Sequence, residues 1–372
     1  MDPIAHTFTG ATLAAAGLRR ATPLATAALI MGANAPDVDV VMMFAGDFGD
    51  VAHRRGWTHG VLALALWPFA LTGLLLAWDR WLRRRRTPSA APARAGPLFA
   101  LSALAVVTHP TLDWVNNYGL RWLMPFDGRW FYGDALVVVD PWVWLTLGGV
   151  LFLTYSRSRL ARVCWAAFWV LTSVAVVANS AIVPPVARVV WFAVLSALVG
   201  VRVLGVLGHR RAVATEPAAA AALVLVALYV GVMVGSDYAE RAQVRTALAG
   251  ARVGRVEQVM VAPAVANPFA GEVVASTADV YYTGRWNWFG RPRFEPDGEA
   301  ILRPRGAVFE AAARAPEARR YLSWARFPYI EVEPHPAGGT AVRFADVRYR
   351  YRDALGGPTV RLDHDLRVIS AD

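Results

Sequence analysis

Histidine and aspartate residues gather in four short groups before residue 114 of this 372-residue chain. The seven residues are His6, Asp37, Asp39, His53, His59, His109 and Asp113. Imidazole and carboxylate groups suit Zn²⁺ and neighbouring divalent ions, and an aspartate can bridge two ions. Cys164 is the single cysteine, which excludes a site built from several thiolates. We therefore expect the seven residues to bind one or two divalent ions, with zinc as the first choice.

The spacing within two of these groups favours side chains that point toward the same place. His109 and Asp113 are four residues apart, so on a helix both side chains point to one face. Pro36 should end the apolar segment before it, and Asp37 and Asp39 point the same way if an extended or turn segment follows. Each residue taken singly also has a simpler interpretation. His6 alone suits a hydrogen-bonded boundary residue, and Asp37 alone suits a helix cap.

The residues around these groups indicate hydrolysis. A bound metal lowers the pKa of water toward neutrality, and paired metals clamp both oxygens of a displacement. Arg54 and its neighbour Arg55 carry charge that suits phosphate oxygens, although they could instead anchor the chain at the membrane interface. Asn117 follows Asp113 by one turn and could orient a substrate. We assign catalytic roles to Asp39, Arg54 and Asn117.

The composition indicates a membrane protein. Hydrophobic residues make up 56% of the chain and charged residues 18%, where soluble domains carry about a quarter, and the mean hydropathy is +0.36. Six apolar segments approach the roughly 20 residues that a spanning helix needs. They are Thr58–Trp78, Pro97–Val115, Leu136–Tyr155, Cys164–Val183, Val186–Leu207 and Ala218–Gly235. Near the third segment Asp134 could reach the metal site and Asp140 could support it, or either could cap the helix.

Arginines mark one set of ends of these segments. The three groups are Arg80 with Arg83–Arg86, then Arg157, Arg159 and Arg162, then Arg202, Arg210 and Arg211. The positive-inside rule places these alternate loops in the cytoplasm. The metal site and everything after Gly235 then face the non-cytoplasmic side of the membrane. This distribution also explains the net charge of +10, so we expect the lipid bilayer as a partner and no nucleic acid.

The two ends of the chain differ in character. Ala11–Leu18 and Pro23–Ala35 are apolar but short, and they could form a hairpin of short helices or two full crossings. From about Asp237 the pattern is typical of a soluble α+β domain. Turn signals separate expected strands from a helix at Glu310–Arg326, which Pro316 breaks or restarts. The expected strands are Val256–Val261, Val273–Tyr282, Tyr329–Glu333, Ala341–Tyr351 and Val360–Ile369.

The predicted fold class is an α-helical polytopic membrane bundle with a C-terminal α+β soluble domain. Residues 1–155 form the metal-site membrane domain, with short N-terminal helices followed by spanning helices. Residues 156–236 add further spanning helices. Residues 237–372 form the soluble domain, which the topology places on the non-cytoplasmic side.

The chain resembles the YdjM-like family of inner-membrane metal-dependent hydrolases over about residues 1–155. Gly60 stands where this resemblance leads us to expect serine. The matching features are His6, the run Ala35–Asp39, the run His53–His59, and Thr108-His109 followed by Asp113.

A more distant likeness is to zinc-dependent phospholipases C and related helical metallohydrolases. Asp39 precedes His53 by fourteen residues, and His109 and Asp113 have the expected His-x-x-x-Asp form. This likeness implies that Asp39 and Asp113 are metal ligands or bridges. The later His-x-x-x-Glu of those enzymes has no counterpart here, so one or two ions fit better than three.

Two functions of different classes follow. The first is a membrane-bound hydrolase that cleaves phosphoester bonds of a lipid or lipid-linked substrate. The second is a non-catalytic membrane protein with a structural metal site and a partner-binding C-terminal domain, since a buried metal contributes folding energy. A transporter is a weaker third, because no inverted repeat is visible.

Overall fold

The computed structural model describes residues 1–46, 48–180, 182–207, 214–335, 338–350 and 356–372. These residues fall into two compact units. The first, which we call the helical unit, consists of Met1–Val38, Gly56–Ser236 and Ala262–Phe269. The second, which we call the mixed unit, consists of Asp39–Arg55, Asp237–Val261 and Ala270–Asp372.

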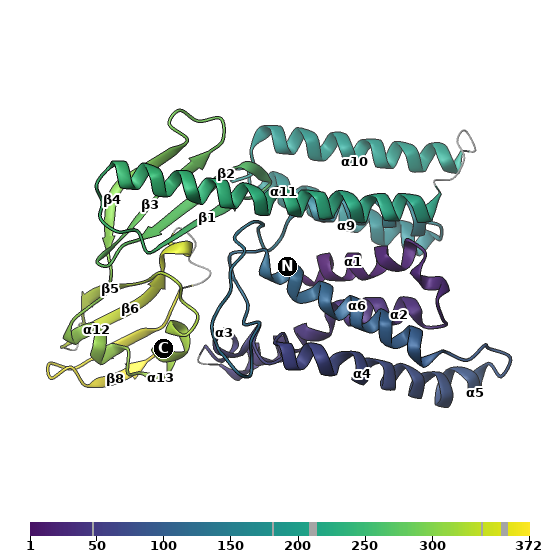
Figure 1. Ribbon diagram of the computed structural model, residues 1–372, viewed down its shortest axis with the longest axis horizontal. Helices are drawn as coiled ribbons and strands as arrows, with labels where there is room; N and C mark the ends of the chain where they lie inside the picture. The colour runs from purple at the N-terminus through teal and green to yellow at the C-terminus, as the bar shows by residue number, and fades with distance from the viewer. Residues whose placement is uncertain (47, 181, 208–213, 336–337, 351–355) are drawn as a thin grey trace. The chain divides into compact units, whose positions relative to one another are not determined.

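The helical unit is built from apolar helices (Figure 1). They are α1 (Pro3–Ala15), α2 (Ala25–Asn34), α4 (Val61–Trp78), α6 (Ala95–Trp114), α7 (Pro141–Val143), α8 (Gly149–Tyr155), α9 (Arg159–Ala178), α10 (Pro185–Val206) and α11 (Thr215–Gly250), whose residues from Asp237 on belong to the mixed unit. A π-helical turn, Trp144–Gly148, joins α7 to α8, so Pro141–Tyr155 is continuous. Another follows α4 at Asp79–Arg83 and leads into α5 (Arg84–Arg86).

Within the described residues, six helices are long and apolar enough to cross a membrane. They are Ala25–Phe44, Val61–Arg86, Ala95–Trp114, Arg159–Ala178, Pro185–Val206 and Thr215–Gly250. The chain is therefore a multi-pass membrane protein, and the predicted fold class is confirmed. Two expectations differ in detail. Ala25–Phe44 is long enough to span although it was not among the six expected segments. The expected segment Leu136–Tyr155 is too short as a helix to be counted.

Asp140 explains why the third expected segment is shorter than its apolar run. Its carboxylate accepts hydrogen bonds from the backbone N–H groups of Trp142 and Val143, at 2.9 and 3.1 Å, and Pro141 occupies the first helical position. Both features start a helix at this point. The remaining 15 residues reach only about 22 Å, against a hydrocarbon core of about 30 Å.

Glycines let α1, α2 and α6 approach closely. A methyl group at Gly10 would lie 2.9 Å from the Cα of Ile30 in α2, and one at Gly32 would lie 2.8 Å from the Cβ of Ala105 in α6. Small residues at helix crossings bring backbones together in this way. The contact of α2 with α6 fixes the end of α2 beside the last turns of α6, where the candidate ligands lie.

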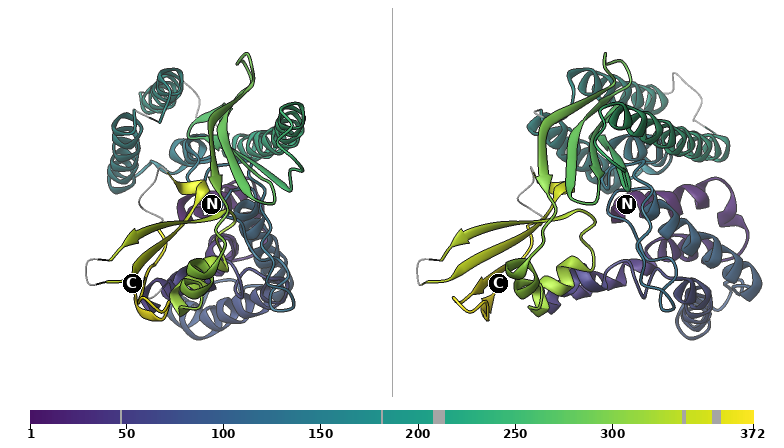
Figure 2. Two further views of the ribbon diagram at one scale, coloured as in Figure 1. Left: turned by 90° about the vertical axis from the view of Figure 1, so that its left-hand side faces the viewer. Right: turned by 60° about the vertical axis from the view of Figure 1, so that its left-hand side comes forward.

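The mixed unit contains most of two four-stranded sheets, in the orders β1-β2-β3-β4 and β5-β6-β7-β8. Figure 2 shows them as separate ribbons, green for the first and yellow-green for the second. The strands are β1 (Gln258–Ala264), β2 (Asn267–Ser276), β3 (Val280–Asn287), β4 (Phe294–Leu302), β5 (Pro328–Pro334), β6 (Thr340–Asp346), β7 (Thr359–Leu362) and β8 (Val368–Ala371). Strand β3 pairs antiparallel with β2 and with β4, and the neighbouring strands from β5 to β8 are antiparallel as well.

Several boundaries in this unit differ from expectation because hairpin turns interrupt apolar runs. The expected strand at Val273–Tyr282 is the end of β2 and the start of β3, which turn at Thr277, and the run from Val360 to Ile369 is the hairpin of β7 and β8. Pro316 starts a second helix, which was one of the two expected alternatives. The two helices are α12 (Ala307–Ala312) and α13 (Pro316–Leu322). Asp237, where the composition changes, lies inside α11 rather than in a linker.

Candidate metal centre

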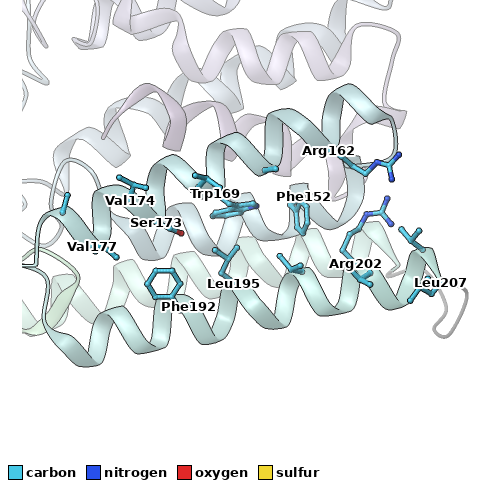
Figure 3. A pocket seen from close by; sticks show the side chains of 16 residues that line it. Phe152, Arg162, Trp169, Ser173, Val174, Val177, Phe192, Leu195, Arg202 and Leu207 are labelled. Carbon is cyan, nitrogen blue, oxygen red and sulfur yellow. The ribbon is translucent and has the colours of Figure 1, made fainter.

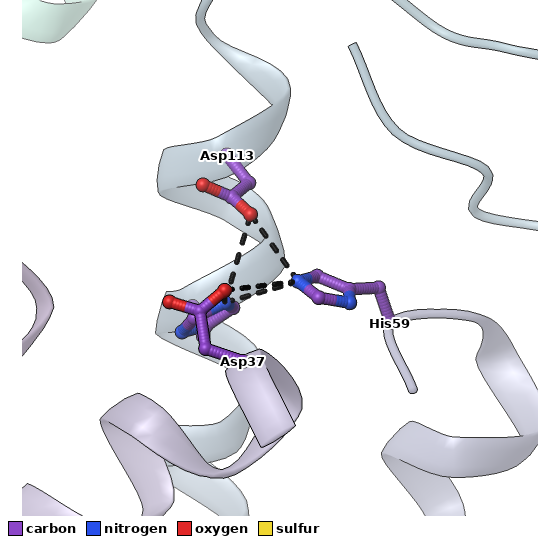
Figure 4. A group of neighbouring side chains, drawn as sticks. Asp37, His59 and Asp113 are labelled. Atoms are coloured by element: carbon purple, nitrogen blue, oxygen red, sulfur yellow. Dashed lines mark hydrogen bonds and ion pairs between the residues drawn. The ribbon is translucent and has the colours of Figure 1, made fainter. Parts of the chain in front are cut away.

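Four of the seven candidate ligands come together in the helical unit. Asp37 comes from the 3₁₀ helix Ala35–Ala45 that follows α2, His59 from the loop before α4, and His109 and Asp113 from successive turns of α6. One donor atom from each lies within 4.8 Å of the other three. In Figure 4 the labelled side chains of Asp37, His59 and Asp113 point toward one another.

The separations fit a single divalent ion. The Nε2 atom of His59 lies 3.1 Å from Nε2 of His109, 3.3 Å from Oδ2 of Asp113 and 3.9 Å from Oδ1 of Asp37. His109 Nε2 lies 3.6 Å from each of the same carboxylate atoms. Bonds of about 2.0–2.1 Å in a tetrahedron put neighbouring donor atoms about 3.3 Å apart. The donor set and its spacing therefore suit Zn²⁺ or a similar ion.

Each of the two histidines forms a hydrogen bond through Nδ1, which leaves its Nε2 atom facing the other candidate ligands. The Nδ1 atom of His109 lies 2.7 Å from the carbonyl oxygen of Ala33, so this nitrogen carries the proton and donates. When the ring is neutral, Nε2 then presents a lone pair toward the group. The Nδ1 atom of His59 lies 2.9 Å from the hydroxyl of Thr58. Partners of this kind fix the tautomer and the ring orientation of metal-binding histidines.

His6 lies beside the four-residue group. Its ring stacks on that of His109, with centroids 3.8 Å apart, and its Nε2 lies 3.4 Å from Oδ1 of Asp113. Asp113 thus faces His59 and His109 with one oxygen and His6 with the other, and the amino group of Met1 also contacts that second oxygen. Burial lowers the pKa of His6 to about 3. A neutral ring with both nitrogens buried and unbonded suits a further ligand.

Burial is uneven across the group. The side chains of His59, His109 and Asp113 are fully buried, whereas that of Asp37 is 15% exposed. Ionisable groups inside an apolar bundle are costly and are therefore usually functional. Asp37 is thus the one member of the group whose side chain reaches solvent.

The remaining predicted site residues lie outside this group. Asp39 belongs to the mixed unit, where its carboxylate accepts from the backbone N–H of Arg55 at 2.8 Å and lies 4.0 Å from Nε of Arg54. His53 ends the short helix α3 (Gly49–His53) and is exposed. Asn117 is half-buried in the turn after α6.

The separation of Asp39 from Asp37 has a local cause, and the expected extended or turn conformation is wrong. Both residues lie in the 3₁₀ helix Ala35–Ala45, which Pro36 joins at its second position. A 3₁₀ helix has three residues per turn, so side chains two positions apart point about 120° away from each other. The two aspartate side chains therefore point in different directions, and a ligand role for Asp39 stays a prediction.

Two glycines around His59 were not anticipated as determinants of the site. A methyl group at Gly56 would lie 2.9 Å from Cζ of the buried Arg121. A methyl group at Gly60 would lie 2.8 Å from Cβ of Met124 and still closer to the Met124 carbonyl oxygen. The loop after α6 thus packs directly on the backbone around His59. This contact explains glycine at position 60, where the family resemblance led us to expect serine.

We predict that Gly60→Ala destabilises the protein by about 1–3 kcal/mol, because the methyl group has no space and the Met124 backbone must shift. The matched control is Gly73→Ala in α4, where a methyl group meets no atom within 4 Å. Thermal unfolding of both variants in detergent tests this. Equal unfolding temperatures would show that the close contact at Gly60 is not required.

Together the fold and the site define a multi-pass membrane protein with a buried cluster of two histidines and two aspartates. Residues 1–183, just under half of the chain, match the model of the YdjM inner membrane protein family. Residues 307–371 match the YfhP C-terminal alpha/beta plait domain. The first match confirms the resemblance to the YdjM family, whereas the likeness to zinc-dependent phospholipases C stays a prediction.

One curated relative is similar over part of its length. It is the protein named "Uncharacterized protein YfhP" from Bacillus subtilis (strain 168), 25% identical over 129 residues, which are 35% of this chain and 36% of the relative. The chain thus matches about a third of the relative's length. No solved structure matches the chain.

Proposed function

We propose that this protein is a membrane-bound, metal-dependent hydrolase that cleaves phosphoester bonds of a lipid or lipid-linked substrate. The observation that carries the proposal is the cluster of Asp37, His59, His109 and Asp113, whose donor atoms lie within 4.8 Å of one another and whose Asp37 is partly exposed. The match of residues 1–183 to an inner-membrane family supports the setting.

The protein's own residues would hold the ion and limit its surroundings. His109, oriented by the Ala33 carbonyl, and Asp113, one turn later on α6, provide a rigid pair of donors. His59 and Asp37 complete the set from two other segments. A divalent ion bound there supplies Lewis acidity and activates water for attack on a phosphorus centre. The catalytic roles of Asp39, Arg54 and Asn117 stay predictions.

The sidedness of the site is part of the proposal. The arginines at 83–86 and at 157–162 satisfy the positive-inside rule only if the chain crosses back between Trp114 and Arg157. Pro141–Tyr155 is the apolar helix in that interval. We propose that it returns the chain as a short membrane helix, with the cluster and the C-terminal domain on the non-cytoplasmic side. Labelling of a cysteine added after Asp372 by an impermeant reagent in intact cells tests this.

A second function is a non-catalytic membrane protein whose metal holds the helices together. The observation in its favour is that four protein donors can close a tetrahedral site, as in structural zinc centres, whereas catalytic zinc keeps one position for water. Asp37 decides between the two functions, because a partly exposed carboxylate can give way to water or substrate.

A substrate screen with a metal readout separates them. Purified protein is loaded with Zn²⁺ or Mn²⁺ and offered phosphodiesters and phosphomonoesters, free and lipid-linked. We expect turnover that stops on metal removal and returns when metal is restored. Metal bound at a constant ratio with no turnover of any substrate would favour the structural role, and turnover that survives thorough metal removal would contradict the hydrolase mechanism.

A further inference from the structure

A long groove lies between α9 and α10, apart from the candidate metal centre. Its volume is about 920 Å³, at the upper end of pockets that hold small-molecule ligands. Figure 3 shows the two helices side by side with the lining side chains between them. The lining residues on α9 run from Arg162 to Ala178, about 24 Å along the helix. The groove therefore extends over most of a hydrocarbon core of about 30 Å.

The walls of the groove are apolar along this length. Phe152 and the largely buried Trp169 contribute aromatic surface, and valines, leucines and alanines supply most of the rest. The hydroxyl of Ser173 already accepts a hydrogen bond from Nε1 of Trp191 at 3.0 Å. A hydrocarbon chain fits such a surface, because most of the lining side chains are apolar.

Two arginines close one end of the groove. Arg162 comes from the first turn of α9 and Arg202 from the last turns of α10, and Figure 3 shows both side chains at the same end. Arg202 is held in place, since its Nε donates to the hydroxyl of Ser156 and its Nη2 to the Ser156 carbonyl, each at 2.7 Å. The end of the groove is thus polar, positively charged and anchored on one side.

No acidic side chain in the described part of the chain pairs with this charge. The sequence contains no aspartate or glutamate between Asp140 and Glu216. Among the described residues neither Arg162 nor Arg202 forms an ion pair. An arginine fork matches the oxygens of a phosphate, and the positive end of a helix N-terminus adds to the attraction. The cationic end of the groove thus matches the phosphate headgroup of a phospholipid, and the apolar remainder matches its acyl chains.

We propose that the groove between α9 and α10 is a specific binding site for an anionic phospholipid. The phosphate binds between Arg162 and Arg202, and an acyl chain lies along the apolar walls. This site is separate from the candidate metal centre and does not depend on the proposed hydrolase activity.

Native mass spectrometry of the full-length protein in detergent tests the proposal. The probes are phosphatidylglycerol and phosphatidylcholine with identical acyl chains. We expect tighter binding of phosphatidylglycerol, and a loss of about 5-fold in its affinity for each arginine replaced, from about 1 kcal/mol per basic residue near an anionic surface. Arg162→Gln/Arg202→Gln should therefore reduce phosphatidylglycerol binding by about 25-fold and phosphatidylcholine binding much less, because the choline cation offsets the charge of its phosphate. Arg159→Gln, an exposed arginine of the same helix outside the groove, is the matched control.

A second variant tests the apolar body of the site. Ala166→Trp should fill the groove and weaken both lipids, whereas Ala167→Trp, next to it but not lining the groove, should weaken neither. Displacement of the lipid by glycerol phosphate at equal concentration would overturn the proposal, because the chains would then contribute nothing. Equal losses with Arg159→Gln, or a lipid-free dimer as the stable species, would also overturn it.

Discussion

Replacing His109 with alanine is expected to remove bound metal and phosphoester hydrolysis together. The Nε2 atom of His109 lies within 3.6 Å of the facing donor atoms of His59, Asp37 and Asp113, so the substitution takes one donor from the middle of the group. Loss of a catalytic ion removes several kcal/mol of transition-state stabilisation. At 1.36 kcal/mol per tenfold change, turnover should fall by about 10³-fold or more.

The control is His364→Ala, which removes an exposed histidine of the C-terminal domain. It should retain the metal content and turnover of the unmodified protein. Membrane insertion and elution as a single species should be the same for both variants. A His109→Ala protein that keeps its metal would refute the assignment of this residue as a ligand.

The second large effect concerns stability with and without metal. Asp37 contacts the two histidines through Oδ1, and its asparagine variant keeps the shape of the side chain but loses the charge. In metal-loaded protein Asp37→Asn should weaken metal binding and lower the unfolding temperature. A ligand at 1,000 times its Kd stabilises by about 4 kcal/mol, which corresponds to roughly 10 °C for a domain of this size.

In metal-free protein the same substitution should have the opposite or no effect, because it removes one of two carboxylates that no longer share a cation. This difference between metal-loaded and metal-free protein distinguishes a metal site from an ion-pair network of aspartates with protonated histidines. In such a network Asp37→Asn would destabilise the protein most strongly without metal. Thermal unfolding of both proteins, loaded and chelated, makes the comparison.

Local spacing made part of the site predictable. His109 and Asp113 are four residues apart in a long apolar run, so their common helix face followed from helical periodicity alone. The convergence of Asp37 and His59 on that face depends on how α2, α6 and the loop before α4 pack. Glycines such as Gly32 and Gly60 set that packing through close backbone contacts, and a single sequence does not reveal which glycine meets which neighbour.

The separation of Asp39 from Asp37 was not predictable in the same way. Pro36 is compatible with an extended segment, a turn or the first turn of a helix, and only the observed 3₁₀ conformation directs the two carboxylates apart. The membrane helices followed from hydropathy, yet Asp140 shortened one of them by starting it late. In the C-terminal domain, β4 was missed because charged residues such as Glu295, Asp297 and Glu299 give it no apolar pattern.

The most direct test of the metal centre is the ratio of metal to protein, measured by elemental mass spectrometry after the purified full-length protein is loaded with Zn²⁺ and excess ion is removed. The account predicts one or two tightly bound ions per chain, and loss of at least one from Asp113→Ala and from His109→Ala but not from His364→Ala. A loaded protein without stoichiometric metal, or the same ratio in all three variants, would contradict it.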